Sequence, residues 1–262
     1  MNFFSFIKNI LPITFSRMLS WFLIPYLSYP SDSLIVLSFS RDIFPALILI
    51  TTVIVLFSGF VFCGWPAQSS MTPKRQFRTD TELGFLLFIS VAQVFTNSLY
   101  LLTNVSLFFL VAFSIEIAFC LWESLYLGRS NRLPVESITH HVCTIFAIPI
   151  SMYVTDLPLG LLVQLSLSVS SGNVVVCASK LLYRKSPESK TTKQIGIVIS
   201  FWVSILYRIL IPTVNVGWIM FHFFFRIDPG ERPGWTRLYL TSLLMLLALN
   251  YQMVSFMKQT RV

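Results

Sequence analysis

Two adjacent histidines, His140 and His141, are the residues best suited to chemistry in this chain. They are two of its three histidines and they precede an apolar run over 142–150. Imidazole exchanges a proton near physiological pH, so a histidine can act as a general base or acid. Adjacent side chains on a helix point about 100° apart, so the pair lacks the i, i+4 spacing of a helical metal site. Two interpretations stay open: a functional site, or one histidine packed in a bundle and one bonded to a neighbouring carbonyl.

Three further charged residues lie inside apolar segments. Glu116 and Glu123 are seven residues apart, which places them on one helical face about 10 Å from each other. Arg208 falls at the expected depth of Glu116, and we expect a Glu116–Arg208 ion pair, because pairing offsets the cost of two buried charges. This structural use is favoured over a direct role in chemistry. Glu123 with a histidine would form an acid/base pair, and the alternative is an ordinary interhelical hydrogen bond.

Three amides complete the polar set at membrane depth. Gln164 and Asn173 belong to polar stripes of one apolar segment, together with Ser166, Ser168, Ser170 and Ser171. Small hydroxylated residues let helices pack closely, so close packing is the favoured interpretation and a polar cavity lining is the alternative. Asn250, in the last apolar segment, is interpreted as an interhelical hydrogen-bonding group rather than as a ligand contact.

The composition indicates a membrane protein. Hydrophobic residues make up 55% of the 262 positions and charged residues only 11%, whereas soluble domains carry about 25% charged residues. The net charge of +8 does not indicate nucleic-acid binding, because the basic residues lie in short loops between apolar runs. The four cysteines have no CxxC or Cys/His ligand spacing, so we expect neither a disulfide framework nor a metal site. No cofactor is required by any motif.

The fold class predicted from these runs is all-α: a polytopic transmembrane helix bundle of about seven spans, within a range of six to eight, since each span needs about 20 residues. Pro212 is expected to kink the sixth span. The expected spans cover residues 43–63, 83–102, 106–127, 136–154, 159–178, 195–225 and 238–257.

The chain divides into four expected parts. Residues 1–42 form an N-terminal segment, in which 11–29 are interpreted as an interfacial helix rather than an extra span. The first span and its basic loop follow over 43–78, then the main transmembrane domain over 79–258 and a short basic tail over 259–262. Twelve lysines and arginines flank one side of the bundle and six the other. The positive-inside rule therefore predicts a lumenal N-terminus and a cytosolic C-terminus.

Four segments, in this order, resemble the TLC-domain family: 122–127 (WESLYL), 136–144 (ESITHHVCT), 206–212 (LYRILIP) and 249–254 (LNYQMV). The resemblance covers about 79–258. This family includes ceramide synthases, translocating-chain-associating membrane proteins, a cargo receptor of the neuronal ceroid lipofuscinosis type and smaller lipid-regulating proteins. In its ceramide synthases the paired histidines are implicated in acyl transfer from acyl-CoA to a sphingoid amine, which would make His140 and His141 the catalytic candidates.

The chain departs from the ceramide synthases after the histidine pair. Those enzymes carry a second motif with histidine and aspartate, whereas residues 170–174 here read SSGNV. The resemblance is therefore to the smaller members. It implies a protein of the endoplasmic reticulum membrane that binds a lipid or acyl chain and influences membrane lipid homeostasis.

Three alternatives stay open beside that interpretation. The first is an N-acyltransferase of ceramide-synthase type that uses acyl-CoA. The second is a cargo receptor or translocation accessory protein. The third is a transporter, since intramembrane Glu and Arg occur there too. Membrane lipids are the expected partners, and the sequence leaves homo- or hetero-oligomerisation open.

Overall fold

The computed structural model describes residues 33–65, 78–130, 133, 135–151, 159–185, 190–225, 241 and 243–251. These residues are almost wholly helical, and no β-strand occurs among them, so the all-α class is confirmed for this part of the chain. The elements are α2 (Ser33–Cys63), α3 (Asp80–Thr103), α4 (Ser106–Arg129), α5 (Val135–Ser151), α6 (Leu159–Lys185), α7 (Lys190–Ile205), η1 (Leu206–Leu210) and α8 (Ile211–Phe225). A further helical segment covers 243–251.

Five segments of the described residues are long and apolar enough to cross a membrane: Ile43–Cys63, Asp80–Thr103, Ser106–Arg129, Leu162–Leu182 and Gln194–Trp218. They correspond to expected spans one, two, three, five and six. Helix α5 has 17 residues up to Ser151, and of the seventh expected span only 241 and 243–251 are described. The count of seven spans therefore stays a prediction. The N-terminal interfacial helix (11–29), the loop 66–77 and the tail 259–262 lie outside the described residues.

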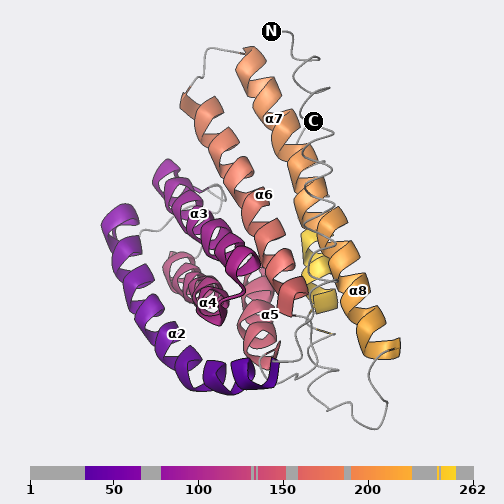
Figure 1. The fold of residues 1–262 in the computed structure, drawn as a ribbon. Helices are drawn as coiled ribbons and strands as arrows, with labels where there is room; N and C mark the ends of the chain where they lie inside the picture. Colours follow the sequence, from indigo (N-terminus) through magenta and orange to yellow (C-terminus); the bar gives the residue numbers. More distant parts are fainter. Residues whose placement is uncertain are drawn as a thin grey trace.

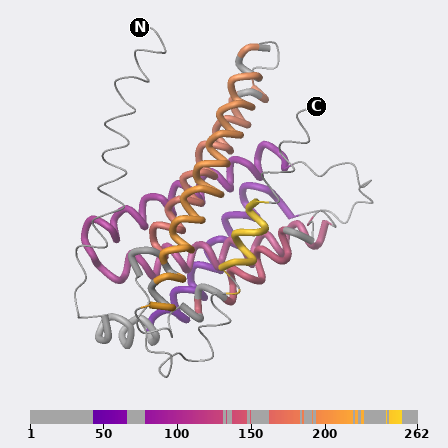
Figure 2. The backbone as a smooth tube through the Cα atoms, turned by 90° about the vertical axis from the view of Figure 1, so that its right-hand side faces the viewer, coloured from indigo at the N-terminus to yellow at the C-terminus, as the bar shows by residue number. Residues whose placement is uncertain are grey.

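Helix α4 lies at the centre of the bundle and α2 at its edge. Within the candidate spans, 61% of the α4 segment is buried, against 11% of the α2 segment. The most extensive helix contacts among the described residues are those of α3 with α6 and of α2 with α4. Figure 1 shows α6 beside α7, on the side of the bundle away from α2. Both views show α6 and α7 extending beyond α3 at one end (Figure 2). The exposed face of α2 is rich in large apolar side chains, as a lipid-facing helix requires.

The start of α3 and the close approach of α2 to α4 each have a local cause in the sequence. The first is a capping box, and the second is a glycine. Thr79 and Glu82 form a reciprocal capping box, in which the Glu82 N–H donates to Thr79 Oγ1 and the Thr79 N–H donates to Glu82 Oε2. At the α2–α4 contact, a Cβ added to Gly59 would overlap Nε1 of the Trp122 indole. Only glycine lets the two backbones pack this closely.

The sixth expected span contains a π-helical turn before Pro212. In such a turn the N–H of residue i+5 bonds to the carbonyl of residue i, as Ile211 does to Leu206. The next carbonyl, that of Tyr207, would need an N–H from residue 212, which is proline and has none. Ser168 of α6 donates to that carbonyl instead, at 2.7 Å from Oγ to O. The distortion expected at Pro212 is thus a π turn braced by a neighbouring helix.

Candidate functional site

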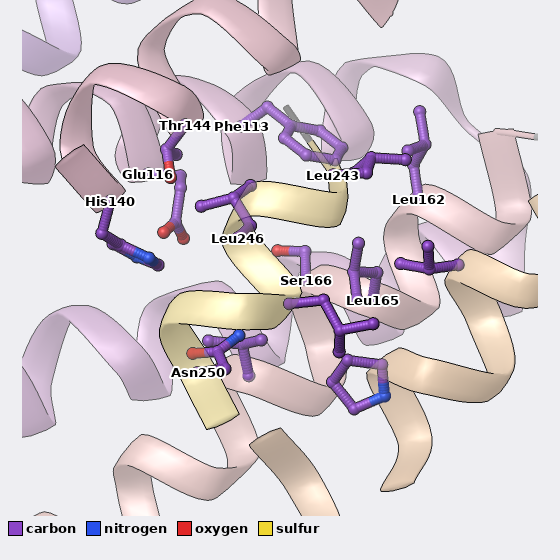
Figure 3. Close-up of a pocket in the computed structure, with 14 residues that line it drawn as sticks. Phe113, Glu116, His140, Thr144, Leu162, Leu165, Ser166, Leu243, Leu246 and Asn250 are labelled. Atoms are coloured by element: carbon purple, nitrogen blue, oxygen red, sulfur yellow. The ribbon is translucent and has the colours of Figure 1, made fainter. Parts of the chain in front are cut away.

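A pocket of about 90 Å³ lies among α4, α5, α6, α8 and the segment 243–250. Most of its wall is apolar and comes from leucines of α6 and of the last described helix, with Phe113, Val169, Pro212 and Val216. Its polar lining residues are Glu116, His140, Thr144, Ser166 and Asn250. Figure 3 shows His140 and Glu116 toward one side of the pocket, with Leu162 and Leu165 toward the other. The pocket therefore has mainly apolar walls and also exposes the side chains of Glu116, His140 and Asn250 to a ligand.

Two polar atoms at this pocket have no hydrogen-bond partner within the described part of the chain. They are Nδ1 of His140 and Oδ1 of Asn250, and both atoms are buried. The Asn250 residue as a whole is 5% exposed. Leaving a buried polar group unsatisfied costs about 1–3 kcal/mol. A bound ligand or water with its own donor or acceptor would remove that cost.

The second histidine, His141, has a different environment. Its Nε2 lies 3.0 Å from Oε2 of Glu123, and its Nδ1 lies 2.8 Å from Oγ of Ser124. Glu123 also forms an ion pair with Arg78, which immediately precedes the N-cap of α3. His141 and Glu123 are both buried. The structure thus brings Glu123 of α4 together with His141 of α5 and with Arg78, which lies just before α3.

Ser124 forms hydrogen bonds within α4 and with His141, and it does not contact the pocket. Its hydroxyl also donates to the carbonyl of Cys120, 2.7 Å away, which is the usual i−4 bond of a serine inside a helix. A hydroxyl has one proton, so when Ser124 donates to Cys120 it can only accept from the Nδ1–H of His141. Ser124 does not line the pocket. The Ser124–His141–Glu123 arrangement is therefore a network of interhelical bonds.

The structure separates the two histidines, which were predicted to form one site. The two rings are 6.0 Å apart between centroids. His140 lines the pocket, whereas His141 is held by Glu123 and Ser124. This division follows from the angle of about 100° between successive side chains on a helix. Of the two catalytic candidates, only His140 is placed to contact a pocket ligand.

The predicted Glu116–Arg208 ion pair is wrong. Glu116 accepts a hydrogen bond from Nε2 of Gln93, and Arg208 donates from Nη2 to Oδ1 of Asn173. The ion pairs formed among the described residues include none between Glu116 and Arg208. An expected similarity in depth does not decide partners, because the rotation of each helix about its axis also selects which neighbours its side chains meet. Here the partner of Glu116 is the amide of Gln93 on α3, and the partner of Arg208 is the amide of Asn173 on α6.

The polar stripes of α6 are mostly helix contacts. Asn97 Nδ2 donates to Ser166 Oγ at 3.0 Å, and Ser170 Oγ donates to Gln93 Oε1 at 3.1 Å. Gln93 and Asn97 are four residues apart on α3, and so are Ser166 and Ser170 on α6. The two hydrogen bonds therefore lie one helical turn apart, and α3 and α6 run antiparallel at this contact. Ser166 also lines the pocket, and the buried Gln164 does not. Ser170 therefore fits the close-packing interpretation, and Ser166 fits both, because it contacts α3 and also lines the pocket.

Two residues of this region were not predicted from the sequence. Gln93 bridges Glu116 of α4 to Ser170 of α6, and Arg78 neutralises Glu123. Gln93 had a detectable signal, because an amide in the middle of an apolar span needs an interhelical partner. No feature of the sequence marked Arg78 as part of the site, since a basic residue next to a span is usual at a membrane surface.

Comparisons with models of protein families, with curated proteins and with solved structures found no match. The TLC-domain resemblance therefore stays a prediction from four sequence segments. Within the described residues, no group of three or more His, Cys, Asp or Glu side chains is arranged to hold a metal ion.

Proposed function

We propose that this protein is a TLC-domain-like integral membrane protein that binds a lipid or acyl chain in its helix bundle and takes part in membrane lipid homeostasis. The observation that carries the proposal is the pocket, which combines leucine-rich walls with Glu116, His140 and Asn250. An apolar chain gains from burial against such walls, and a few polar groups fix its orientation. The endoplasmic reticulum membrane is the location that the resemblance supports.

The size of the pocket limits what part of a lipid it holds. A cavity needs about 10–15 Å³ to hold one water molecule, and this pocket has a volume of about 90 Å³. That is room for a short stretch of chain or a small polar group with a few carbons. The rest of the ligand would lie along the helices or in the bilayer.

A second candidate function is acyl transfer from acyl-CoA to a lipid amine or hydroxyl. It is favoured by the buried Nδ1 of His140, which has no partner among the described residues and belongs to a residue that lines the pocket. In this reaction the imidazole removes the proton of the nucleophile as it attacks the thioester carbonyl. The bond from carbonyl carbon to sulfur then breaks, and the CoA thiolate takes the proton.

A pocket-filling variant tests ligand binding. Leu165→Trp places a large ring in the pocket wall, whereas Leu182→Trp makes the same change at a 65% exposed position of the same helix. Each purified full-length protein is analysed by mass spectrometry for co-purifying lipid. We expect the first variant to lose the lipid retained by wild type and the second to keep it. Equal lipid in all three proteins would refute binding in this pocket.

Activity is tested separately. The full-length protein is incubated with acyl-CoA and a long-chain amine or hydroxyl acceptor, and acylated product is measured by mass spectrometry. Product from wild type that disappears in His140→Ala would support the acyltransferase. Ligand binding without product would support the lipid-binding function alone.

A further inference from the structure

Two amides of α3 hold polar residues of the pocket in place. Nε2 of Gln93 donates to Glu116, and Oε1 of Gln93 accepts from Ser170 of α6 at 3.1 Å. Nδ2 of Asn97 donates to Oγ of Ser166 at 3.0 Å. Gln93 and Asn97 are 3% and 0% exposed, and neither lines the pocket. The positions of Glu116 and Ser166 are therefore fixed before a ligand binds, which lowers the entropy cost of binding.

The hydroxyl proton of Ser166 is left for a ligand. In its bond with Asn97 the serine oxygen is the acceptor, and a hydroxyl still has one proton to donate. A serine or threonine inside a helix commonly donates to the carbonyl four residues earlier, as Thr51, Thr96, Ser124, Ser204 and Thr213 do here. Ser166 makes no such bond within the described part of the chain. Because it lines the pocket, it can donate to a group bound there.

Asn250 supplies a matching acceptor. Its Oδ1 is buried and has no hydrogen-bond partner among the described residues, and it belongs to the helical segment 243–251. Figure 3 shows Ser166 between Glu116 and Leu165, so it lies where the polar side of the pocket meets the apolar wall. One pocket is therefore lined by a free donor on α6 and by a free acceptor on a second helix.

The charges of the lining disfavour two other kinds of polar group. The lining contains Glu116 and neither lysine nor arginine, so a carboxylate or a phosphate would be buried without a cationic partner. An ammonium can pair with Glu116, but it has three donors and no acceptor. The proton of Ser166 would then stay unpaired. A hydroxyl group both accepts and donates, so it satisfies Ser166 and Asn250 together.

The apolar lining continues from these two polar residues along the same helical faces. Between 162 and 169 of α6 the lining residues are spaced i, i+3, i+4 and i+7, and those between 243 and 250 have the same spacing. Such a spacing places side chains on one face of a helix. Each face has three apolar side chains and one polar side chain, Ser166 or Asn250. A hydrocarbon chain attached to the bound hydroxyl is stabilised by burial against them.

We propose that the pocket binds a lipid alcohol, whose hydroxyl group accepts a hydrogen bond from Ser166 and donates one to Oδ1 of Asn250. The hydrocarbon chain lies against the apolar side chains of α6 and of the last described helix. This inference rests on the proposed function, because it names the polar group of the chain that the pocket binds.

A photoreactive alcohol tests the inference. A dodecanol with a diazirine in its chain is irradiated with the full-length protein in neutral detergent, and labelled peptides are identified by mass spectrometry. Three unlabelled competitors have the same chain. They are 1-dodecanol, its methyl ether, which only accepts, and dodecylamine, which is an ammonium at neutral pH and only donates. We expect pocket residues to be labelled. Dodecanol should reduce that labelling at about three- to tenfold lower concentration than the other two, as for one hydrogen bond.

Two variants assign the two hydrogen bonds. Asn250→Leu should abolish the advantage of dodecanol over the ether, because the donor of the alcohol then has no acceptor. It should not lower the unfolding temperature of the unliganded protein, since Oδ1 of Asn250 has no internal partner among the described residues. Ser166→Ala should abolish the advantage of dodecanol over the ammonium. Ser171→Ala, at a position of α6 that does not line the pocket, should keep both advantages. If Ser166→Ala does not fold because Asn97 loses its acceptor, Asn250→Leu still decides.

This inference and the proposed function fail in different ways. If Leu165→Trp abolishes labelling but the three competitors act equally, the pocket binds a chain without recognising a hydroxyl, and only this inference is overturned. It is also overturned if the ammonium competes best, or if Asn250→Leu keeps the advantage over the ether. If no pocket peptide is labelled, or if Leu165→Trp is labelled there as strongly as wild type, the proposed function fails as well.

Discussion

Nε2 of His141 lies 3.0 Å from Oε2 of Glu123, and both side chains are buried between α4 and α5. Glu123 is also paired with Arg78, so one carboxylate joins a histidine and an arginine from two other segments. His140, the next residue in the chain, lines the pocket instead. His140 is therefore placed for ligand contact, and His141 for linking α5 to α4.

Replacing Glu123 should destabilise the protein strongly. Glu123→Gln leaves Arg78 and His141 without their carboxylate, and breaking a buried ion pair costs about 3–5 kcal/mol. We expect the lower end of that range, since the Arg78 side chain is 31% exposed. Asp80→Asn is the control, because it breaks a more exposed pair with Arg184 and such pairs contribute about 0–1 kcal/mol. Thermal unfolding in detergent measures both, and equal effects would contradict the role of Glu123.

The two histidines should respond differently to the same substitution. His140→Ala should leave the unfolding temperature near that of wild type and change the amount or type of lipid that co-purifies. His141→Ala should lower the unfolding temperature, because it removes a buried partner of Glu123. The readouts are thermal unfolding and lipid mass spectrometry on the same preparations. Identical behaviour of the two variants would mean that the division between them is wrong.

Enlarging Gly59 should disrupt the contact between α2 and α4. The new methyl group of Gly59→Ala would overlap the indole of Trp122, which is buried and stacked on Tyr126. Overpacking of this kind costs about 1–3 kcal/mol. Gly84→Ala on α3 meets nothing within 4 Å and should be neutral or stabilising by about 0.5–1 kcal/mol. Unfolding temperatures decide between these outcomes, and an equally mild effect of both substitutions would argue against the close approach.

Removing the hydroxyl that supports the π turn should also destabilise the fold. Ser168→Ala leaves the carbonyl of Tyr207 without its donor, and a buried unsatisfied acceptor costs about 1–3 kcal/mol. Ser171→Ala, on the same helix, removes a hydroxyl that has no hydrogen-bond partner among the described residues. It should change stability by less than half as much. A smaller effect of Ser168→Ala than of Ser171→Ala would show that the turn does not depend on this bond.

The orientation predicted from the basic residues can be measured directly. Glycosylation tags are fused through long spacers to the N-terminus and, in a second protein, to the C-terminus. We expect the N-terminal tag to be glycosylated and the C-terminal tag to stay unmodified, since the more basic side faces the cytosol. Glycosylation of the C-terminal tag would reverse the topology.

The sequence by itself determined the helical class of the described residues, the length and apolar character that suit five segments to crossing a membrane, and several of the polar residues within the apolar segments. These properties depend on composition and on the length of apolar runs, which the burial of a helix in hydrocarbon requires directly. The pairing of Glu123 with a histidine was also accessible, because both residues lie at the same depth on neighbouring helices in the chain.

Only the tertiary structure decided which residues meet. Glu116 and Arg208 were expected at matching depth, yet they bond to Gln93 and Asn173. The choice depends on the rotation of each helix about its axis and on close contacts such as Gly172 against Tyr207. The division of His140 from His141 has the same cause, since a turn of about 100° between neighbouring side chains sends one to the pocket and the other to Glu123. Packing, which periodicity does not encode, sets these angles.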